Sequence, residues 1–422
     1  RRDEDAGDPG EAWRPAASRF GQAGALPVRR DSPRAEDLSV LSLPPLALYI
    51  HIPWCVRKCP YCDFNSHRAP EALPVADYVR ALLADLDQEL PQVWGRPVSS
   101  IFFGGGTPSL FPGAAIGEIL EGVAARLRLM PGLEVTLETN PGTAEFDRFE
   151  AYRAAGVNRI SFGVQSFDNA RLAALGRIHD SGQAKRAFAL AREAGFDNIN
   201  LDVMYALPGQ TLDGALSDLE QAIALAPEHL SHYHLTLEPN TLFAAKPPPG
   251  LPDEDSAWDM QAACQQRLAE AGYAQYEISA YARPGRRSQH NLNYWQFGDY
   301  LGIGAGAHGK ITLPAEDAIL RRWKLKHPQA YLDAATSSAR IGSEQHIAAV
   351  DLPFEFMLNA LRLLEGSTLS TFEARTGLPR SALDSAFAKA QARGWLETDG
   401  ERFRASALGQ QFQNDLIGLF LA

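Results

Sequence analysis

Apolar and polar residues follow two periods along most of this chain, one typical of buried strands and one typical of amphipathic helices. Six apolar runs predict strands: Leu46–Pro53, Val98–Phe103, Leu133–Thr139, Asn158–Val164, Asp197–Met204 and His229–Leu237. Segments with helical spacing follow them: Val75–Leu90, Ala114–Leu129, Ala144–Ala155, Gln183–Ala194, Leu212–Ala226 and Asp255–Ala271. Repeated strand–helix pairs predict an α/β fold with a parallel sheet, either open and twisted or a partial barrel. Function is then expected at the carboxyl ends of the strands.

The two ends of the chain differ from this region. Residues 1–44 mix Arg, acidic residues, Ala, Gly and Pro without an apolar run, which predicts a disordered leader rather than a signal peptide. The strand–helix region is expected over residues 45–280, and residues 281–352 are expected to connect it to a last domain. Residues 353–422 predict helices and a hairpin at Asp399-Gly400, which indicates a mainly helical, winged-helix-like domain.

Composition excludes several classes of protein. The chain of 422 residues carries 40 basic and 51 acidic residues, so a basic nucleic-acid-binding face is not expected. Its apolar runs are shorter than the roughly 20 residues that span a bilayer. Four cysteines are too few for a disulfide scaffold. The last domain is also slightly acidic, which favours an interaction or lid role over DNA binding.

A cluster of cysteines follows the first predicted strand. Its members have the spacing C-x3-C-x2-C: Cys55, Cys59 and Cys62. Such a cluster predicts a metal site in a reducing compartment. Structural zinc would need a fourth ligand, such as His51 or His67. A [4Fe–4S] cluster held by three cysteines would keep one iron open, because Cys264 lies far away on a helix and is expected in the core.

Polar or glycine residues end the next strands. Gly104-Gly105-Gly106 would let bare backbone approach a ligand, and its amides could bind a carboxylate. Glu138, Gln165 and Asp202 each close an apolar strand, so they are expected at one rim of the sheet. One polar strand end usually satisfies a loop amide, but several beside a cysteine cluster favour ligand contacts.

A second candidate site is the segment His290-Asn291-Leu292-Asn293-Tyr294-Trp295. A neutral imidazole is a common ligand of haem iron, and aromatic neighbours would pack on the macrocycle. The alternative is that His290 is a hydrogen-bonded core residue. His308 is a competing ligand, although its glycine-rich surroundings favour a structural turn.

The segment from Tyr49 to His67 (YIHIPWCVRKCPYCDFNSH) resembles the radical S-adenosylmethionine (SAM) superfamily, in its coproporphyrinogen oxidase-like branch. The resemblance implies a partial (β/α) barrel, a [4Fe–4S] cluster on the three cysteines, SAM on the open iron and an electron donor. It also implies contacts with SAM from residues spread over the sheet rim: Tyr49, Tyr61, Gly105, Gly106, Thr107, Glu138, Gln165, Arg177 and Asp202.

Within that branch, PYCDFNSH and HNxxYW are similar to the HemW-type haem chaperones, and Phe64 stands where the oxidase has a further cysteine. The resemblance implies a cytoplasmic protein that binds haem at His290 and passes it to acceptor haem proteins, including respiratory ones at the membrane. It implies no coproporphyrinogen oxidase activity. The alternatives are an oxygen-independent coproporphyrinogen III oxidase, which decarboxylates two propionates, and a zinc-stabilised adaptor without SAM chemistry.

Overall fold

The computed structural model describes residues 41–143 and 146–421. Residues 1–40 of the predicted leader lie outside the described residues, as do Ala144 and Glu145 at the predicted start of one helix. Leu41 is buried in the C-terminal core, and the Ser42 amide donates to the Ala374 carbonyl at 2.8 Å. Residues just before the first strand are therefore tied to the last part of the chain.

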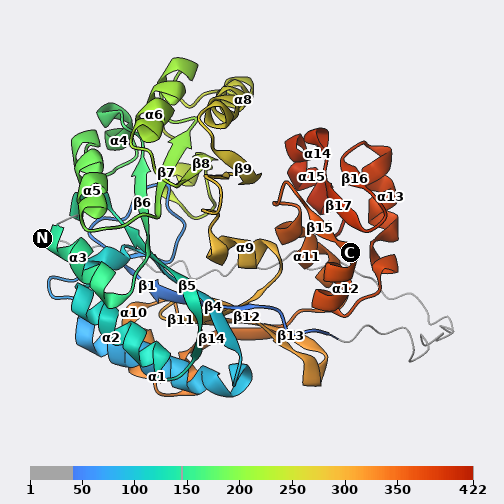
Figure 1. Ribbon diagram of the computed structural model, residues 1–422, viewed down its shortest axis with the longest axis horizontal. Coiled ribbons are helices and arrows are strands. Elements are labelled where there is room, and N and C mark those ends of the chain that lie inside the picture. Colours follow the sequence, from blue (N-terminus) through green and yellow to red (C-terminus); the bar gives the residue numbers. More distant parts are fainter. Residues whose placement is uncertain (1–40, 144–145, 422) are drawn as a thin grey trace, which may run out of the picture. The chain divides into compact units, whose positions relative to one another are not determined.

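A 12-stranded sheet forms the centre of the described region (Figure 1), with the order β14-β13-β12-β11-β1-β4-β5-β6-β7-β8-β10-β9. The predicted parallel strands are present as β1 (Leu46–Ile52), β4 (Pro97–Gly105), β5 (Arg128–Thr139), β6 (Arg159–Gln165), β7 (Ile199–Tyr205) and β8 (His229–His234). Neighbours in this group all pair in parallel. Buried residues on both faces of β1 explain its nearly continuous apolar run.

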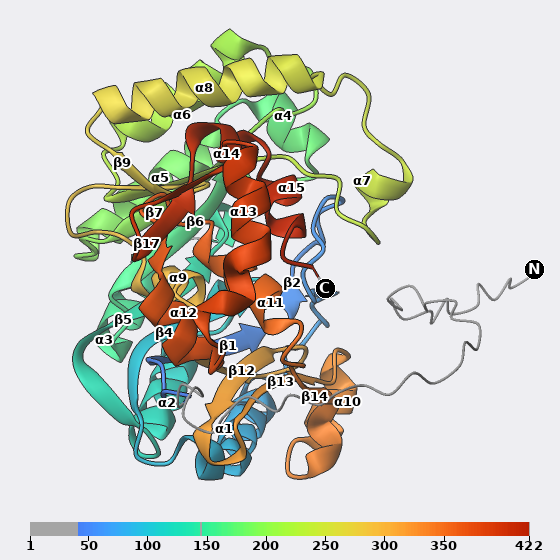
Figure 2. The ribbon, with the colours of Figure 1, turned by 90° about the vertical axis from the view of Figure 1, so that its right-hand side faces the viewer.

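Helices cover one face of this sheet (Figure 1). They are α1 (Val75–Val93), α2 (Gly113–Ala124), α3 (Phe146–Ala155), α5 (Ser181–Glu193), α6 (Leu212–Ala224) and α8 (Glu254–Glu270), with the shorter α4 (Asn169–Ala174). The short helix α7 (Leu242–Ala245) lies apart from them (Figure 2). The helices α6 and α8 lie side by side in both views (Figures 1 and 2). On α1, Tyr78, Leu82 and Leu86 recur at helical spacing and are fully buried.

The predicted helix Ala114–Leu129 is too long. Helix α2 ends at Ala124, and β5 begins at Arg128. Arg128 pairs with Pro97, and Leu129 pairs with Val98 of β4. Pairing with a neighbouring strand therefore outweighs the helical spacing of the apolar residues here.

The sheet continues through residues 281–352, the region predicted to hold the haem motif and to connect two domains. Strand β11 (Asp299–Ile303) pairs in parallel with β1, and β12 (His308–Leu313), β13 (Ala318–Lys324) and β14 (Ile341–His346) follow as antiparallel neighbours. At the other edge, β10 (Ala280–Ala282) and β9 (Ala274–Glu277) pair antiparallel. Helices α9 (Gln289–Trp295) and α10 (Pro328–Ala334) lie in the same region.

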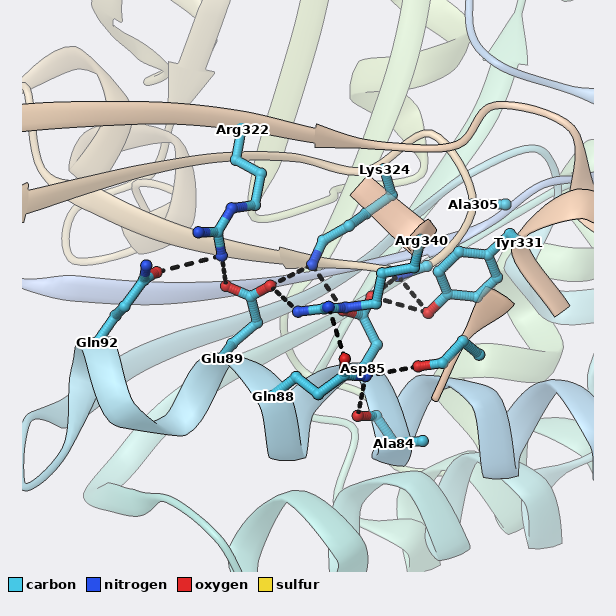
Figure 3. Close-up of polar contacts among 12 residues, drawn as sticks. Ala84, Asp85, Gln88, Glu89, Gln92, Ala305, Arg322, Lys324, Tyr331 and Arg340 are labelled. Carbon is cyan, nitrogen blue, oxygen red and sulfur yellow. Dashed lines mark hydrogen bonds and ion pairs between the residues drawn. The ribbon is translucent and has the colours of Figure 1, made fainter. Parts of the chain in front are cut away.

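A buried ion network joins α1 to this added part of the sheet (Figure 3). Lys324 Nζ and Arg340 Nε each donate to Asp85 Oδ1 at 2.6 Å, and Arg340 Nη2 donates to Glu89 at 2.7 Å. The Gly304 amide donates to the other Asp85 oxygen at 3.2 Å. Buried charges are costly to desolvate unless each is paired, and here both carboxylates have several donors. The network thus orients the turn after β11.

The last part of the chain is mainly helical, as predicted (red in Figure 2). It holds α11 (Leu352–Ala360), α12 (Leu369–Thr376), α13 (Asp384–Ala392), α14 (Ala407–Gln411) and α15 (Gln413–Gly418), with a sheet of β15 (Ser367–Thr368), β17 (Arg402–Ala405) and β16 (Leu396–Thr398). The hairpin at Asp399-Gly400 is confirmed. Phe356 packs on Phe297 with ring centroids 5.4 Å apart, which links this core to the sheet region. No helix in the described ranges has the length and apolar character that crossing a membrane requires.

Candidate functional site

The three clustered cysteines lie on the loop that follows β1. The short strands β2 (Trp54–Cys55) and β3 (His67–Arg68) pair in parallel and close the base of this loop. All three thiols are free and partly exposed, and they line one cavity of about 390 Å³. The Cys62 amide donates to the Cys59 carbonyl at 3.2 Å, which folds the loop back on itself. One loop therefore presents three sulfur atoms to one cavity.

The surroundings of these thiols combine partial burial with a cation. Burial raises the pKa of the Cys55 and Cys62 thiols, and hydrogen bonds from Thr107 and from the Phe64 backbone respectively oppose this. Arg177 Nη1 lies 3.6 Å from Cys59 Sγ. A guanidinium at this distance stabilises a thiolate, which is the form that binds metals.

This donor set suits an iron–sulfur cluster. Its three free cysteine thiols line one cavity, and each could bind a different iron atom of a cluster. Cys264, by contrast, is fully buried in the core on α8, as predicted.

The glycine-rich end of β4 forms one wall of the cavity. Gly105 has φ +112°, and a Cβ there would lie 2.5 Å from the His51 ring. A Cβ on Gly106 would lie 2.5 Å from the Trp54 carbonyl oxygen. The loop therefore needs glycine at both positions.

The amides of this loop were expected to be available to the carboxylate of a ligand, but three of them are already bonded within the protein. The Gly105 amide donates to Glu138 Oε2 at 3.2 Å, the Gly106 amide to the Ile52 carbonyl and the Thr107 amide to the Trp54 carbonyl, both at 2.8 Å. These bonds hold the loop against β1, β2 and β5. Because the glycines lack side chains, the backbone of the loop can still approach a ligand closely.

The polar residues at the strand ends meet at one rim, as predicted: Glu138, Gln165 and Asp202 all line the cysteine cavity. Enclosure of the Glu138 carboxyl and the nearby Asp202 raise the pKa of Glu138 to about 8. Gln165 has φ +70°, a strained conformation for a residue with a side chain, and its Oε1 accepts from Tyr233 at 2.8 Å. Strain of this kind is concentrated at functional sites.

Two further predicted residues border the same cavity. Arg177 Nη2 donates to the Gly163 carbonyl at 2.6 Å, which holds its guanidinium over the cysteine loop. Tyr61 packs on Phe243, with ring centroids 6.3 Å apart, and burial raises the pKa of its phenol. Sequence reasoning missed Ser161, Met204 and Tyr233, which also line this cavity; their position inside or next to the predicted strands was the available signal.

A second cavity of about 820 Å³ adjoins the first and shares Gly105 and Glu138 with it. Its other walls are largely aromatic or basic: Tyr49, His51, Lys58, His67, Phe102, His290, Tyr294, Tyr300, His308 and Lys326. Tyr49, predicted beside SAM, lines this second cavity and contacts His51 Nδ1 through its hydroxyl at 3.0 Å. The predicted haem motif and the cysteine loop thus border neighbouring spaces.

His290 lies in the wall of the second cavity with both ring nitrogens engaged. Its Nδ1 is 3.0 Å from Ser100 Oγ, and its Nε2 is 3.2 Å from the Tyr294 hydroxyl. The ring stacks on Phe102 with centroids 4.9 Å apart, and the residue is 1% exposed. Burial lowers the pKa of His290 to about 3, so its imidazole is neutral.

The other histidines differ in exposure. His308 is exposed at the start of β12 and stacks on Trp323, with centroids 5.7 Å apart. His51, proposed as a zinc ligand, has Nε2 2.8 Å from the Asn65 carbonyl oxygen and Nδ1 against Tyr49. His67, the other candidate, has Nε2 3.2 Å from the Lys326 carbonyl oxygen.

A buried hydrogen-bond chain runs from the first cavity to helix α9. Asn200 Nδ2 donates to Asp202 Oδ1 at 2.8 Å, and its Oδ1 lies 2.6 Å from His229 Nδ1. His229 Nε2 lies 2.8 Å from the Tyr276 hydroxyl, which accepts from the Ser288 amide at 3.3 Å. Ser288 is the N-cap of α9, the helix that carries His290. Nothing in the sequence pattern predicted this series of hydrogen bonds.

Comparison with known proteins agrees with this geometry. The family model of the radical SAM superfamily matches residues 49–222, and that of the HemN C-terminal domain matches residues 347–412. "Heme chaperone HemW" of Escherichia coli K12 is 51% identical over 383 residues, which cover 91% of this chain and 100% of the relative. The protein of the same name from Haemophilus influenzae is 48% identical, with 90% and 98% covered.

A solved structure of E. coli coproporphyrinogen III oxidase (HemN), a radical SAM enzyme, has a TM-score of 0.76 with this chain. The match covers 91% of this chain and 92% of that one at 23% identity, so it shows a shared fold. The parallel sheet with its three-cysteine loop defines a radical SAM protein, and within that superfamily the chain belongs to the HemW family. Membership of the superfamily implies a [4Fe–4S] cluster and SAM, and the three free thiols fit the cluster.

Proposed function

We propose that this chain is a haem chaperone that binds a [4Fe–4S] cluster, SAM and haem and delivers haem to acceptor proteins, including respiratory haem proteins. One observation carries the proposal: a cavity with three free cysteines and a cavity with the HNxxYW segment share the wall formed by Gly105 and Glu138. The names of the relatives, heme chaperone HemW, support it. The protein would act in the cytoplasm, reach the membrane when it delivers haem and take electrons from a separate donor.

Cys55, Cys59 and Cys62 would hold the cluster, which supplies electrons for reductive cleavage of SAM when it is bound. The residues that would contact SAM line the first cavity or its shared wall: Tyr61, Gly105, Gly106, Thr107, Glu138, Gln165, Arg177 and Asp202. Arg177 suits the carboxylate of SAM, and the acceptor oxygens of Gln165 and Asp202 suit its amino group and hydroxyls. Tyr49 lines the second cavity and would contact SAM at the wall that the two cavities share.

Haem would lie in the second cavity. Its volume of about 820 Å³ is within the usual range of roughly 300–1,000 Å³ for ligand sites. Phe102 and Tyr294 offer aromatic surface to a macrocycle, and Lys58 and Lys326 offer cations to its propionates. His290 would ligate the iron, because its imidazole is neutral and lies in the wall of the cavity.

A second candidate function is that of the oxygen-independent coproporphyrinogen III oxidase, with which the chain shares its fold. Against it, the position of the oxidase's further cysteine is Phe64, whose side chain is 59% exposed at the edge of both cavities. A phenyl ring cannot supply the acid–base or ligand chemistry of a thiol.

The test compares haem binding with oxidase activity in the anaerobically reconstituted protein. We expect saturable haem uptake, seen as a Soret band, by the wild type and by the control His308→Ala, and none by folded His290→Ala. We also expect no protoporphyrinogen from coproporphyrinogen III and SAM. Equal haem uptake by His290→Ala would overturn the ligand assignment, and many turnovers of the porphyrinogen would establish the oxidase instead.

A further inference from the structure

We propose that the Tyr294 hydroxyl masks the iron-ligating nitrogen of His290, and that Ser100 selects the imidazole tautomer that places a lone pair on this nitrogen. This inference rests on the proposed binding of haem at His290. It identifies two positioning residues that together determine how readily the imidazole reaches iron.

Each ring nitrogen of His290 has a different hydroxyl group as its hydrogen-bond partner. His290 and Tyr294 are four residues apart on α9 and so lie on the same helix face, where the Tyr294 hydroxyl approaches Nε2 at 3.2 Å. On the opposite side of the ring, Nδ1 meets Ser100 Oγ at 3.0 Å, and Ser100 is fully buried on β4. Phe102 stacks on one ring face, which fixes the plane of the imidazole.

The chemistry of the two partners favours one tautomer. A neutral imidazole has one N–H donor and one acceptor nitrogen, so the two hydroxyl partners of the buried His290 ring cannot play the same role. A phenol is a stronger hydrogen-bond donor than an aliphatic hydroxyl, because its pKa is lower. The favoured arrangement therefore has Tyr294 donating to Nε2 and Nδ1–H donating to Ser100. The lone pair that iron needs is then on Nε2, beneath the tyrosine hydroxyl.

Iron binding in this arrangement exchanges one bond for another without moving a proton on the ring. The O–H···Nε2 bond breaks, the Nε2 lone pair coordinates iron, and the Nδ1–H···Oγ bond is kept. Both Tyr294 and His290 border the second cavity, and the hydroxyl would turn toward this cavity when it leaves Nε2. The Tyr294 hydrogen bond must break before iron binds, so its free energy is subtracted from that of haem binding.

The experiment is a haem titration of the cluster-loaded full-length protein. Tyr294→Phe removes only the hydroxyl, so haem should bind about two- to tenfold more tightly than to the wild type. A second, independent measurement is the 15N chemical shifts of the His290 imidazole in the haem-free wild type, where a proton on Nε2 rather than on Nδ1 would overturn the proposal. Tyr281→Phe is the matched control, since it removes a buried hydroxyl on β10 outside both cavities, and we expect it to bind haem like the wild type. Ser100→Ala should bind haem more weakly, with its Soret band retained.

The sign of the change separates masking from structural damage, because a disturbed fold weakens binding rather than strengthening it. Unchanged or weaker affinity in folded Tyr294→Phe, with the His290→Ala protein unable to bind haem, overturns the mask and leaves the proposed function standing. Complete loss of the Soret band in Tyr294→Phe would make the phenol itself the ligand. Wild-type uptake by His290→Ala would instead defeat the proposed function.

Discussion

At the scale of single residues, the loop after β1 brings three thiols of different surroundings to one cavity. Arg177 stands beside Cys59, and burial raises the pKa values of the Cys55 and Cys62 thiols. A cluster that takes one bond from each thiolate offsets the cost of deprotonating Cys55 and Cys62. The loop is therefore expected to hold three thiolates only when a positively charged group binds them.

Each clustered cysteine should consequently be essential for iron loading. Replacing Cys55, Cys59 or Cys62 with Ala leaves two thiolates, and we expect iron and sulfide per chain to fall to near zero after anaerobic reconstitution. Cys264→Ala is the control, because this thiol is buried in the core of α8 away from the cavity. Full loading of Cys59→Ala, or lost loading in Cys264→Ala, would contradict the assignment.

Glu138 should give the ligand-free chain a pH-dependent stability. Its pKa is raised to about 8 in the folded chain, against about 4.5 when it is unfolded. The folded state thus holds a proton that the unfolded state releases, so this contribution is largest below about pH 4.5 and is lost as the pH rises through about 8. Glu138→Gln stays neutral, and its free energy of unfolding should exceed that of the wild type above about pH 8.

Urea unfolding at several pH values measures this difference, with the exposed Glu121→Gln on α2 as the control. A constant difference between Glu138→Gln and the wild type across the pH range would refute the raised pKa.

Most candidate residues of the first cavity could be predicted from the sequence, because their signals are local. Cysteine spacing and polar residues that close apolar strands need no knowledge of distant contacts. The position of Tyr49 in the second cavity and the pairing of His290 with Ser100 could not be predicted. Ser100 lies 190 positions before His290, so no local signal connects the two residues.

At the scale of elements, helix α9 is held at its N-terminus by a carboxylate from the sheet. Glu134 on β5 accepts from the Gln289 amide at 3.2 Å, the His290 amide at 3.1 Å and the Ser288 hydroxyl at 3.4 Å. These donors lie in the first turn of the helix, where amides have no partner within it and the helix dipole favours a negative charge. The position of His290 is therefore set by β5, which also carries Glu138 next to its last residue.

Removing this carboxylate should loosen α9 without affecting the first cavity. We expect Glu134→Ala to lower the stability of the helix end by about 0.5–2 kcal/mol, as lost caps do, and to weaken haem binding while SAM binding stays unchanged. Hydrogen exchange of the α9 amides, with haem and SAM titrations, measures these effects. The exposed Glu118→Ala on α2 is the control. Unchanged exchange in α9 would show that Glu134 does not hold the helix.

The sequence predicted the parallel strands well because they are buried on both faces and therefore read as apolar runs. It did not predict β11 to β14. For β14 the reason is that all of its residues are exposed or half-buried, so no apolar period marks it. The early end of α2 was missed for a related reason, because only pairing with β4 makes Arg128 and Leu129 part of a strand.

At the scale of the whole described region, the network of Asp85 and Glu89 connects segments that are more than two hundred residues apart in the sequence (Figure 3). It fixes the turn at Gly304, and the neighbouring Ala305 carbonyl accepts from Asn65 of the cysteine loop at 2.9 Å. A single buried carboxylate thus links helix α1, the added strands and the loop that carries the thiols.

Asp85→Asn should therefore be strongly destabilising although it barely changes volume. The amide cannot balance the charges of Lys324 and Arg340, and removing one partner of a buried ion network typically costs about 3–5 kcal/mol. Asp87→Asn is the control, because Asp87 pairs with Arg126 at the surface, where such pairs contribute roughly 0–1 kcal/mol. Urea unfolding of both variants measures the costs. Because Asp85 also holds the turn that Asn65 contacts, Asp85→Asn should release iron faster than Asp87→Asn, in conditions where both remain folded. Equal stability and equal iron retention in the two variants would mean that the network does not support the cysteine loop.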